Sequence, residues 1–201
     1  RDSLLTIETG GVDKLLISWN PTVEVSASYT AGWNLVGAPV RIPHQQFREL
    51  FPGAIANTLY SYEQVYKPQT VLQPGTGYWV RMSDASQQRF NGRAVDKLQT
   101  TLAQGWNLIS GPTLSLSVGL IVDPDEVIIS GTFYGFDGRY ISASELLPGN
   151  GYWVRASKPG TIEMDPYLPP PPPSKSAPSE PVGGVTARFE SGGVVTRVVY
   201  G

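Results

Sequence analysis

The chain has 201 residues, enough for one large domain or two small ones. Its 15 basic and 17 acidic residues leave a net charge of −2, which offers no electrostatic attraction for nucleic acid or anionic lipid. This charge balance makes us expect no nucleic-acid partner. The absence of cysteine excludes disulfide scaffolds, thiolate metal sites and thiol nucleophiles. No run of about 18 apolar residues occurs, so we also expect no membrane span.

Turn-forming residues are abundant along the whole chain. The sequence holds 22 glycines and 18 prolines, spread among short runs of Val, Ile, Leu, Tyr and Trp. Many short apolar runs with frequent turns indicate an all-β fold of short strands.

The first 24 residues are predicted to form a β-hairpin. Two apolar runs, Leu4 to Glu8 and Leu15 to Trp19, flank the turn-prone stretch Thr9 to Asp13. No basic and apolar leader follows Arg1, so we expect any signal peptide to have been removed from this chain.

A long internal duplication follows the predicted hairpin. The segment Ala31 to Val36 (AGWNLV) recurs as Gln104 to Ile109 (QGWNLI). In the same register, Leu72 to Arg81 (LQPGTGYWVR) recurs as LLPGNGYWVR, ending at Arg155, so one spacing of 73 or 74 residues relates both blocks. We therefore predict two tandem homologous domains, residues 25–98 and 99–166, each a small β-sandwich or barrel.

Each duplicated block has a physical interpretation as a turn followed by a strand. In the first block a glycine ends a turn, an apolar strand follows, and Pro39 or Pro112 stops it. In the second block Pro-Gly opens a turn, and we expect the second glycine to adopt a positive φ. Between the blocks of the first repeat, residues 43–51 carry Phe47, Leu50 and Phe51 at helical spacing and predict one short helix.

The paired blocks resemble a repeat of bacterial secreted and cell-surface proteins, where it often occurs in tandem near the C-terminus of large extracellular polypeptides. The resemblance covers roughly residues 25–165 and rests on Gly-Trp-Asn-Leu and Pro-Gly-x-Gly-Tyr-Trp-Val. It implies an exported, β-rich, non-enzymatic module at the cell surface or outside the cell, and it brings no catalytic residues with it.

The C-terminal part differs from the repeats. Residues 167–181 are predicted to be a proline-rich linker in an extended polyproline conformation, and residues 182–201 a tail of two strands. These strands need a sheet to join, because a lone hairpin is marginally stable. They either fold back on the N-terminal hairpin or add to a sheet of another molecule. The apolar residues assigned to such a subunit interface are Val185, Phe189, Val194, Val195, Val198, Tyr200, Leu4, Leu5 and Ile7.

No constellation for catalysis, metal binding or cofactor binding stands out. His44 is the only histidine and has no nucleophile motif to serve, so we interpret it as a surface or capping residue. The acidic group Asp123, Asp125 and Glu126 lacks the spacing of a calcium loop and is better explained as a turn between strands. We therefore expect no enzyme, no cofactor and no metal site.

The aromatic residues divide into two sets. The duplicated tryptophans Trp33, Trp79, Trp106 and Trp153 are interpreted as core residues, because they recur at matched positions of a duplicated fold. A second set is the candidate surface for stacking on sugar rings: Tyr60, Tyr62, Tyr66, Tyr134, Phe136 and Tyr140.

The leading hypothesis for function is a structural one. The chain would be a non-enzymatic extracellular subunit that self-associates into a surface filament or fibre by exchanging its terminal strands. The alternative is a carbohydrate-binding or adhesion module of a larger secreted protein. The expected partners are other copies of the chain, cell-surface components or polysaccharide.

Overall fold

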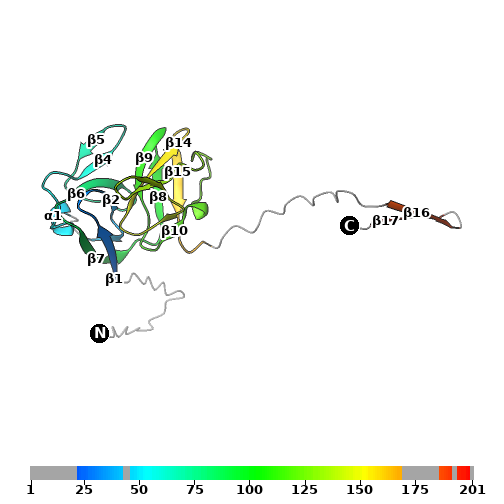
Figure 1. Cartoon of the computed structure of the whole chain (residues 1–201), viewed down its shortest axis with the longest axis horizontal. Helices are drawn as coiled ribbons and strands as arrows, with labels where there is room; N and C mark the ends of the chain where they lie inside the picture. Colours follow the sequence, from blue (N-terminus) through cyan, green and yellow to red (C-terminus); the bar gives the residue numbers. More distant parts are fainter. Residues whose placement is uncertain (1–21, 43–45, 169–185, 192–193, 200–201) are drawn as a thin grey trace, which may run out of the picture. The chain divides into compact units, whose positions relative to one another are not determined.

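A computed structural model describes residues 22–42, 46–168, 186–191 and 194–199 (Figure 1). The chain divides into one compact unit ending at Leu168 and a second beginning at Pro169, and each is described by itself. Most of the predicted N-terminal hairpin, residues 1–21, and all of the segment 169–185 lie outside the described residues. The predicted boundaries of the two repeat domains, at residues 25, 98 and 166, stay predictions.

The first repeat forms two antiparallel sheets, ordered β2-β6-β4-β5 and β1-β7-β3. The short helix α1 covers part of the segment in which a helix is predicted; residues 43–45 are not described. The elements are β1 (Thr22–Tyr29), β2 (Gly32–Gly37), β3 (Val40–Arg41), α1 (Phe47–Leu50), β4 (Tyr60–Tyr62), β5 (Tyr66–Pro68), β6 (Gly77–Met82) and β7 (Ser86–Ala94).

The second repeat forms the equivalent sheets, ordered β12-β11-β14-β9 and β15-β8, and a two-stranded sheet of β10 and β13. All pairings are antiparallel and no described sheet closes into a barrel, so the prediction of an all-β fold is confirmed. The elements are β8 (Leu98–Leu102), β9 (Gly105–Ser110), β10 (Leu116–Ser117), a 3-10 turn η1 (Val118–Leu120), β11 (Tyr134–Phe136), β12 (Tyr140–Ser142), β13 (Glu145–Leu146), β14 (Gly151–Ala156) and β15 (Gly160–Met164).

The asparagine of the Gly-Trp-Asn-Leu block closes the turn that precedes its strand. The Asn34 side chain accepts a hydrogen bond from the Thr30 N–H at 3.0 Å and donates to the carbonyls of Thr30 at 2.8 Å and Gly32 at 3.0 Å. Asn107 makes the same three bonds one repeat later. A short side chain that bonds nearby backbone in this way stabilises a turn, which explains why the block carries asparagine in both repeats.

The tyrosine of the Pro-Gly-x-Gly-Tyr-Trp-Val block holds the other turn. The Tyr78 hydroxyl accepts a hydrogen bond from the Gln73 N–H at 2.9 Å, and the Tyr152 hydroxyl accepts one from the Leu147 N–H at 2.8 Å. Each tyrosine thereby ties the strand it begins to the start of the turn that leads into it.

The two glycines of that turn have different roles, and the expectation for the second one is wrong. The first glycines, Gly75 and Gly149, adopt the positive φ values of +87° and +83°. The second glycines, Gly77 and Gly151, are not in that region. They are required instead by close backbone contact, since a Cβ on Gly77 would lie 2.5 Å from the carbonyl oxygen of Ile109 in the other repeat.

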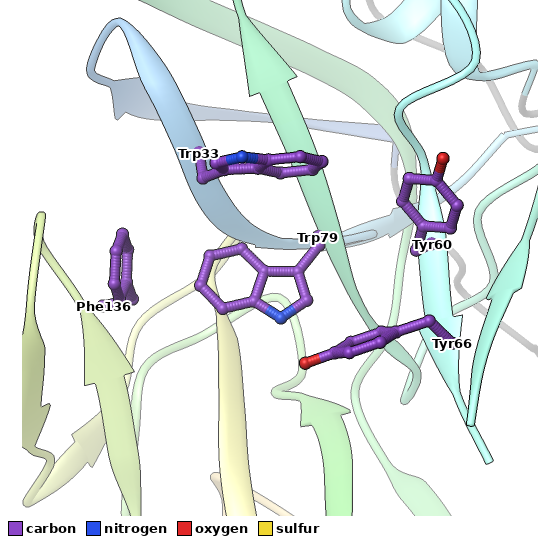
Figure 2. Close-up of a pocket in the computed structure, with 5 residues that line it drawn as sticks. All are labelled: Trp33, Tyr60, Tyr66, Trp79 and Phe136. Atoms are coloured by element: carbon purple, nitrogen blue, oxygen red, sulfur yellow. The ribbon is translucent and has the colours of Figure 1, made fainter. Parts of the chain in front are cut away.

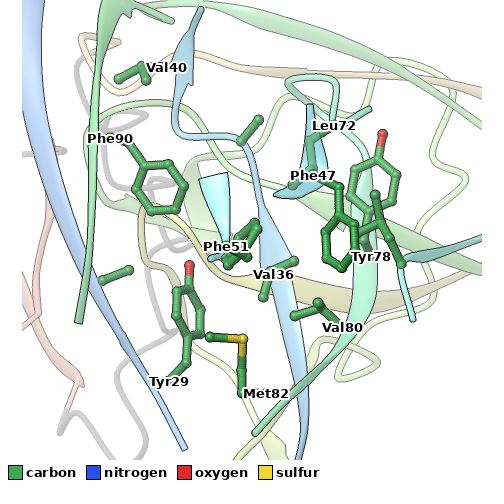
Figure 3. Packing of buried hydrophobic residues seen from close by; sticks show 13 residues of the cluster. Tyr29, Val36, Val40, Phe47, Phe51, Leu72, Tyr78, Val80, Met82 and Phe90 are labelled. Atoms are coloured by element: carbon green, nitrogen blue, oxygen red, sulfur yellow. The ribbon is translucent and has the colours of Figure 1, made fainter. Parts of the chain in front are cut away.

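Each repeat has its own hydrophobic core. Strand alternation directs Val36, Tyr78 and Val80 into the core of the first repeat (Figure 3). There the rings of Phe51 and Phe90 meet edge to face, with centroids 5.8 Å apart. The second core has the equivalent make-up, with Ile109, Tyr152 and Val154 among its buried residues.

Reciprocal backbone contacts join the two repeats within the first compact unit. The Gly37 N–H donates to the Gly149 carbonyl at 2.9 Å, and the Ser110 N–H donates to the Gly75 carbonyl at 3.1 Å. Gly37 and Ser110 occupy matched positions of the duplication, and so do Gly149 and Gly75. The repeats therefore face each other with the same surface, as the subunits of a two-fold dimer do.

The second unit contains one described sheet. Strands β16 (Thr186–Ser191) and β17 (Val194–Val199) pair antiparallel along their whole length, from Thr186 with Val199 to Ser191 with Val194. Of the predicted interface residues, Phe189 lies in β16, and Val194, Val195 and Val198 lie in β17. The others, Val185, Tyr200, Leu4, Leu5 and Ile7, lie outside the described residues.

Candidate functional site

An aromatic cluster lies where the two repeats meet. Strand alternation places Leu35 and Trp79 on the face of their sheet that is opposite to the core of the first repeat. Leu108 and Trp153 take the same positions in the second repeat, and the four residues form one buried cluster shared by both. Half-buried rings pack around it: Tyr60, Tyr62, Tyr134 and Phe136.

Two symmetric ring contacts cross the boundary between the repeats. Tyr62 of the first repeat meets Trp153 of the second with centroids 4.8 Å apart and an interplanar angle of 77°. Phe136, the counterpart of Tyr62, meets Trp79 of the first repeat with the same distance and angle. Edge-to-face pairs at this distance are favourable beyond the area they bury, so each repeat holds the tryptophan of the other in place.

An aromatic pocket opens beside each of these contacts. The first pocket has a volume of about 470 Å³ and is shown in Figure 2, where Phe136 faces Trp79 from a strand of the other repeat. Its lining residues are Trp33, Tyr60, Tyr66, Trp79 and Phe136.

The second pocket is the counterpart of the first, with a volume of about 560 Å³. Its lining residues are Tyr62, Tyr66, Trp106, Tyr134, Tyr140 and Trp153. Every member except Tyr66 lies at the duplicated position of a residue in the first pocket. Tyr66 lines both, so the two pockets adjoin at this side chain.

The four duplicated tryptophans separate into a buried and an exposed pair. Trp79 and Trp153 are 9% and 7% exposed, which confirms their interpretation as core residues. Trp33 and Trp106 are 42% and 37% exposed, so the same interpretation is wrong for them. Each lies next to the first residue of its strand, at the rim of the cluster, and contacts the buried tryptophan of its own repeat from outside.

Hydroxyl and indole groups supply the polar atoms of the pockets. Burial raises the pKa of Tyr66, as does the nearby Tyr140, whereas a hydrogen bond with Trp79 lowers it. Its hydroxyl therefore stays protonated at neutral pH and able to donate. In the second pocket the Nε1 of Trp153 is buried and has no hydrogen-bond partner among the described residues. Such an orphaned buried donor is rare in a folded protein.

The aromatic residues that the sequence offered for sugar stacking lie around the two pockets, and their binding role stays a prediction. All six candidate sugar-stacking residues line the pockets: Tyr60, Tyr66 and Phe136 the first, and Tyr62, Tyr66, Tyr134 and Tyr140 the second. Trp33 and Trp106 were missed as site residues. A signal existed, because a tryptophan directly after the glycine that ends a turn lies at the strand end, where cover from neighbouring strands is least.

Asp123, the first residue of the acidic group Asp123, Asp125 and Glu126, stabilises a turn. Asp123 accepts hydrogen bonds from the N–H groups of Val127 at 3.0 Å and Ile128 at 2.8 Å. Within the described part of the chain, no three His, Cys, Asp or Glu side chains come together as metal ligands would. His44 lies outside the described residues.

No helix in the described ranges is long and apolar enough to span a bilayer. Comparisons of the chain with protein-family models, with curated proteins and with solved structures give no match.

Proposed function

We propose that the first compact unit is a non-enzymatic carbohydrate-binding module that acts outside the cell. The observation that carries this proposal is the pair of adjoining aromatic pockets with the exposed indoles of Trp33 and Trp106 at their rims. The resemblance of the repeats to those of bacterial surface proteins supports the extracellular location.

The pockets have the chemistry that a sugar ring needs. A pyranose presents a face of C–H groups that packs on an aromatic ring, and its hydroxyls bond to tyrosine and indole groups at the edge. All residues that line the two pockets are aromatic, and none is an acidic or basic residue. Exposed aromatic side chains gathered in one place commonly mark a binding surface, since a fold gains little stability from them.

Single substitutions of the exposed tryptophans test the proposal. We expect Trp33→Ala and Trp106→Ala each to weaken binding of a soluble polysaccharide about ten-fold or more, because a stacking platform is lost. Their unfolding temperatures should fall less than that of Trp79→Ala, since Trp33 and Trp106 are 42% and 37% exposed whereas Trp79 is 9% exposed. Isothermal titration calorimetry against a panel of soluble glucans, mannans and xylans measures the effect.

Tyr167→Ala is the matched control, because Tyr167 is exposed but lines neither pocket. It should bind like wild type. Equal affinities of the two tryptophan variants and wild type, or no binding of any glycan by the wild-type protein, would contradict the proposal.

Self-association through the terminal strands is a second candidate function. The observation that favours it is that β16 and β17 form a two-stranded sheet in a unit of their own, and such a sheet is marginally stable in isolation. Strands of this kind gain most by adding to the sheet edge of a neighbouring molecule.

Deleting residues 182–201 tests this second function. We expect the full chain to form oligomers or filaments in analytical ultracentrifugation and negative-stain electron microscopy, and the truncated chain to be monomeric. Glycan binding should be the same in both, since the pockets belong to the first unit. A full chain that stays monomeric at high concentration, or filaments that survive the deletion, would rule out strand exchange.

A further inference from the structure

A polar cleft lies beside the second aromatic pocket. It has a volume of about 920 Å³, and its walls come from β4, the turn after β4 and the segment between β5 and β6 in the first repeat, and from β8 and β9 in the second. Tyr62 and Trp106 line both this cleft and the second aromatic pocket, so the two cavities are continuous along these rings. We call it the amide cleft, after its glutamines Gln64, Gln69 and Gln73.

The amide cleft is polar but almost without charge. Besides the three glutamines it presents the hydroxyls of Thr76, Thr100 and Thr101. Among its lining residues Glu63 is the only acidic or basic one, and it forms an ion pair with Lys67. Amide and hydroxyl groups both donate and accept hydrogen bonds, which matches the hydroxyls of an uncharged sugar.

The second repeat has a cleft at the matched place, which shows what the fold looks like without these glutamines. The matched cleft of the second repeat has about 420 Å³, and it is lined by Ala143 and Leu147 at the positions of Gln69 and Gln73. The fold therefore forms equally well without the two amides. The Tyr29 hydroxyl reaches into this second cleft and donates to the Gly149 carbonyl at 2.7 Å.

The second cleft also has a different charge. Its lining includes the carboxylates of Asp137 and Glu145. Since it is smaller and acidic, it does not offer the uncharged set of hydrogen-bonding groups that the amide cleft has. The two repeats have thus diverged at this place while their folds have stayed the same.

Gln64 adopts a left-handed backbone conformation, which is unfavourable for a residue other than glycine. Its φ is +62°, and the matched residue of the second repeat is Gly138 with a φ of +68°. A non-glycine residue in the left-handed region is strained by about 1 kcal/mol, and such strain is typical of functional sites. The side chain points across the boundary of the repeats, because its Nε2 donates to the Gln104 carbonyl at 3.1 Å.

We propose that the amide cleft binds a neutral oligosaccharide that continues over the two adjoining aromatic pockets, with one such extended site on each chain. The ring of Trp106 supports a sugar face, and the amides of Gln64, Gln69 and Gln73 bond to its hydroxyls. This proposal rests on the proposed carbohydrate-binding function and adds to it the place, the stoichiometry and the uncharged nature of the ligand.

The test replaces the three glutamines by the residues that the second repeat carries at the matched positions. In the variant Gln64→Gly, Gln69→Ala, Gln73→Leu we expect affinity for a neutral hexasaccharide to fall about ten-fold or more. The unfolding temperature should fall by only a few degrees, because glycine relieves the strain at position 64 while the hydrogen bonds of Gln64 to Gln104 and of Gln69 to Ser61 are lost. Gln99→Ala, which removes an exposed amide of β8 outside the cleft, is the control and should change neither quantity.

Isothermal titration calorimetry with neutral cello-, manno- and xylo-hexaose, and with an anionic oligogalacturonate, gives affinity and stoichiometry together. We expect one site per chain and a preference for a neutral sugar. Two sites per chain, a preference for the anionic sugar, or an unchanged affinity of the triple variant would overturn the amide-cleft proposal. If the triple variant bound like wild type but Trp33→Ala still weakened binding, the carbohydrate-binding proposal would stand and the amide-cleft proposal would fail. If no glycan bound the wild-type protein, both proposals would fail.

Discussion

Replacing Gly77 by alanine is expected to destabilise the first compact unit by about 3 kcal/mol. The added Cβ would lie 2.5 Å from the Ile109 carbonyl oxygen and 3.0 Å from the Ile109 backbone nitrogen. Backbone atoms of a paired strand cannot swing aside as a side chain can, so the two repeats must separate locally. Gly151→Ala should act in the same way, because its Cβ would lie 2.8 Å from the Val36 carbonyl oxygen.

Chemical denaturation with urea measures this effect, and a thermal scan should show a lower midpoint by about 2–4 °C for each kcal/mol lost. Gly119→Ala is the matched control, since its nearest neighbour would be the Ser117 side chain at an ordinary 3.8 Å. It should change the free energy of unfolding by less than about 0.5 kcal/mol. A Gly77→Ala variant as stable as this control would show that the repeats do not approach each other so closely.

Truncating a buried tryptophan should also lower the free energy of unfolding strongly. We expect Trp79→Ala to lower the free energy of unfolding by about 3–5 kcal/mol, the usual cost of removing a large aromatic ring from a packed site. The indole packs against the ring of Phe136 across the repeat boundary, with centroids 4.8 Å apart, and it belongs to the buried cluster that includes Leu108. Its loss therefore leaves a cavity between the repeats.

Trp33→Ala is the informative comparison, because the same side chain is lost from the same cluster but from its exposed rim. Its cost should be clearly smaller, about 1–2 kcal/mol, since 42% of Trp33 stays exposed in the fold and only 9% of Trp79 does. Urea denaturation of both variants, followed by circular dichroism so that the lost fluorophore does not matter, gives the two values. Equal losses would contradict the division into a buried and an exposed pair.

The all-β fold was predictable because its signals are local. Alternating apolar residues, turn glycines and the prolines after β2 and β9 act within a few residues of one another. The duplication adds a check, since each element of the first repeat has to occur again in the second.

The candidate site was only partly predictable from the sequence. The six aromatic residues between the duplicated blocks were recognised, and all of them line the pockets. What the sequence did not reveal is that Tyr62 packs on Trp153, or that Phe136 packs on Trp79. Contacts of this kind join positions more than 50 residues apart, and no local pattern encodes them.

The sequence by itself indicated an all-β chain with two copies of one strand-and-turn pattern and aromatic residues at matched positions. Only the tertiary structure decided what the matched positions do. It separated Trp79 and Trp153 from the exposed Trp33 and Trp106, and it assigned the second turn glycine to close contact instead of positive φ. The physical reason is that exposure and steric room depend on how the repeats pack face to face, which pairs residues distant in sequence.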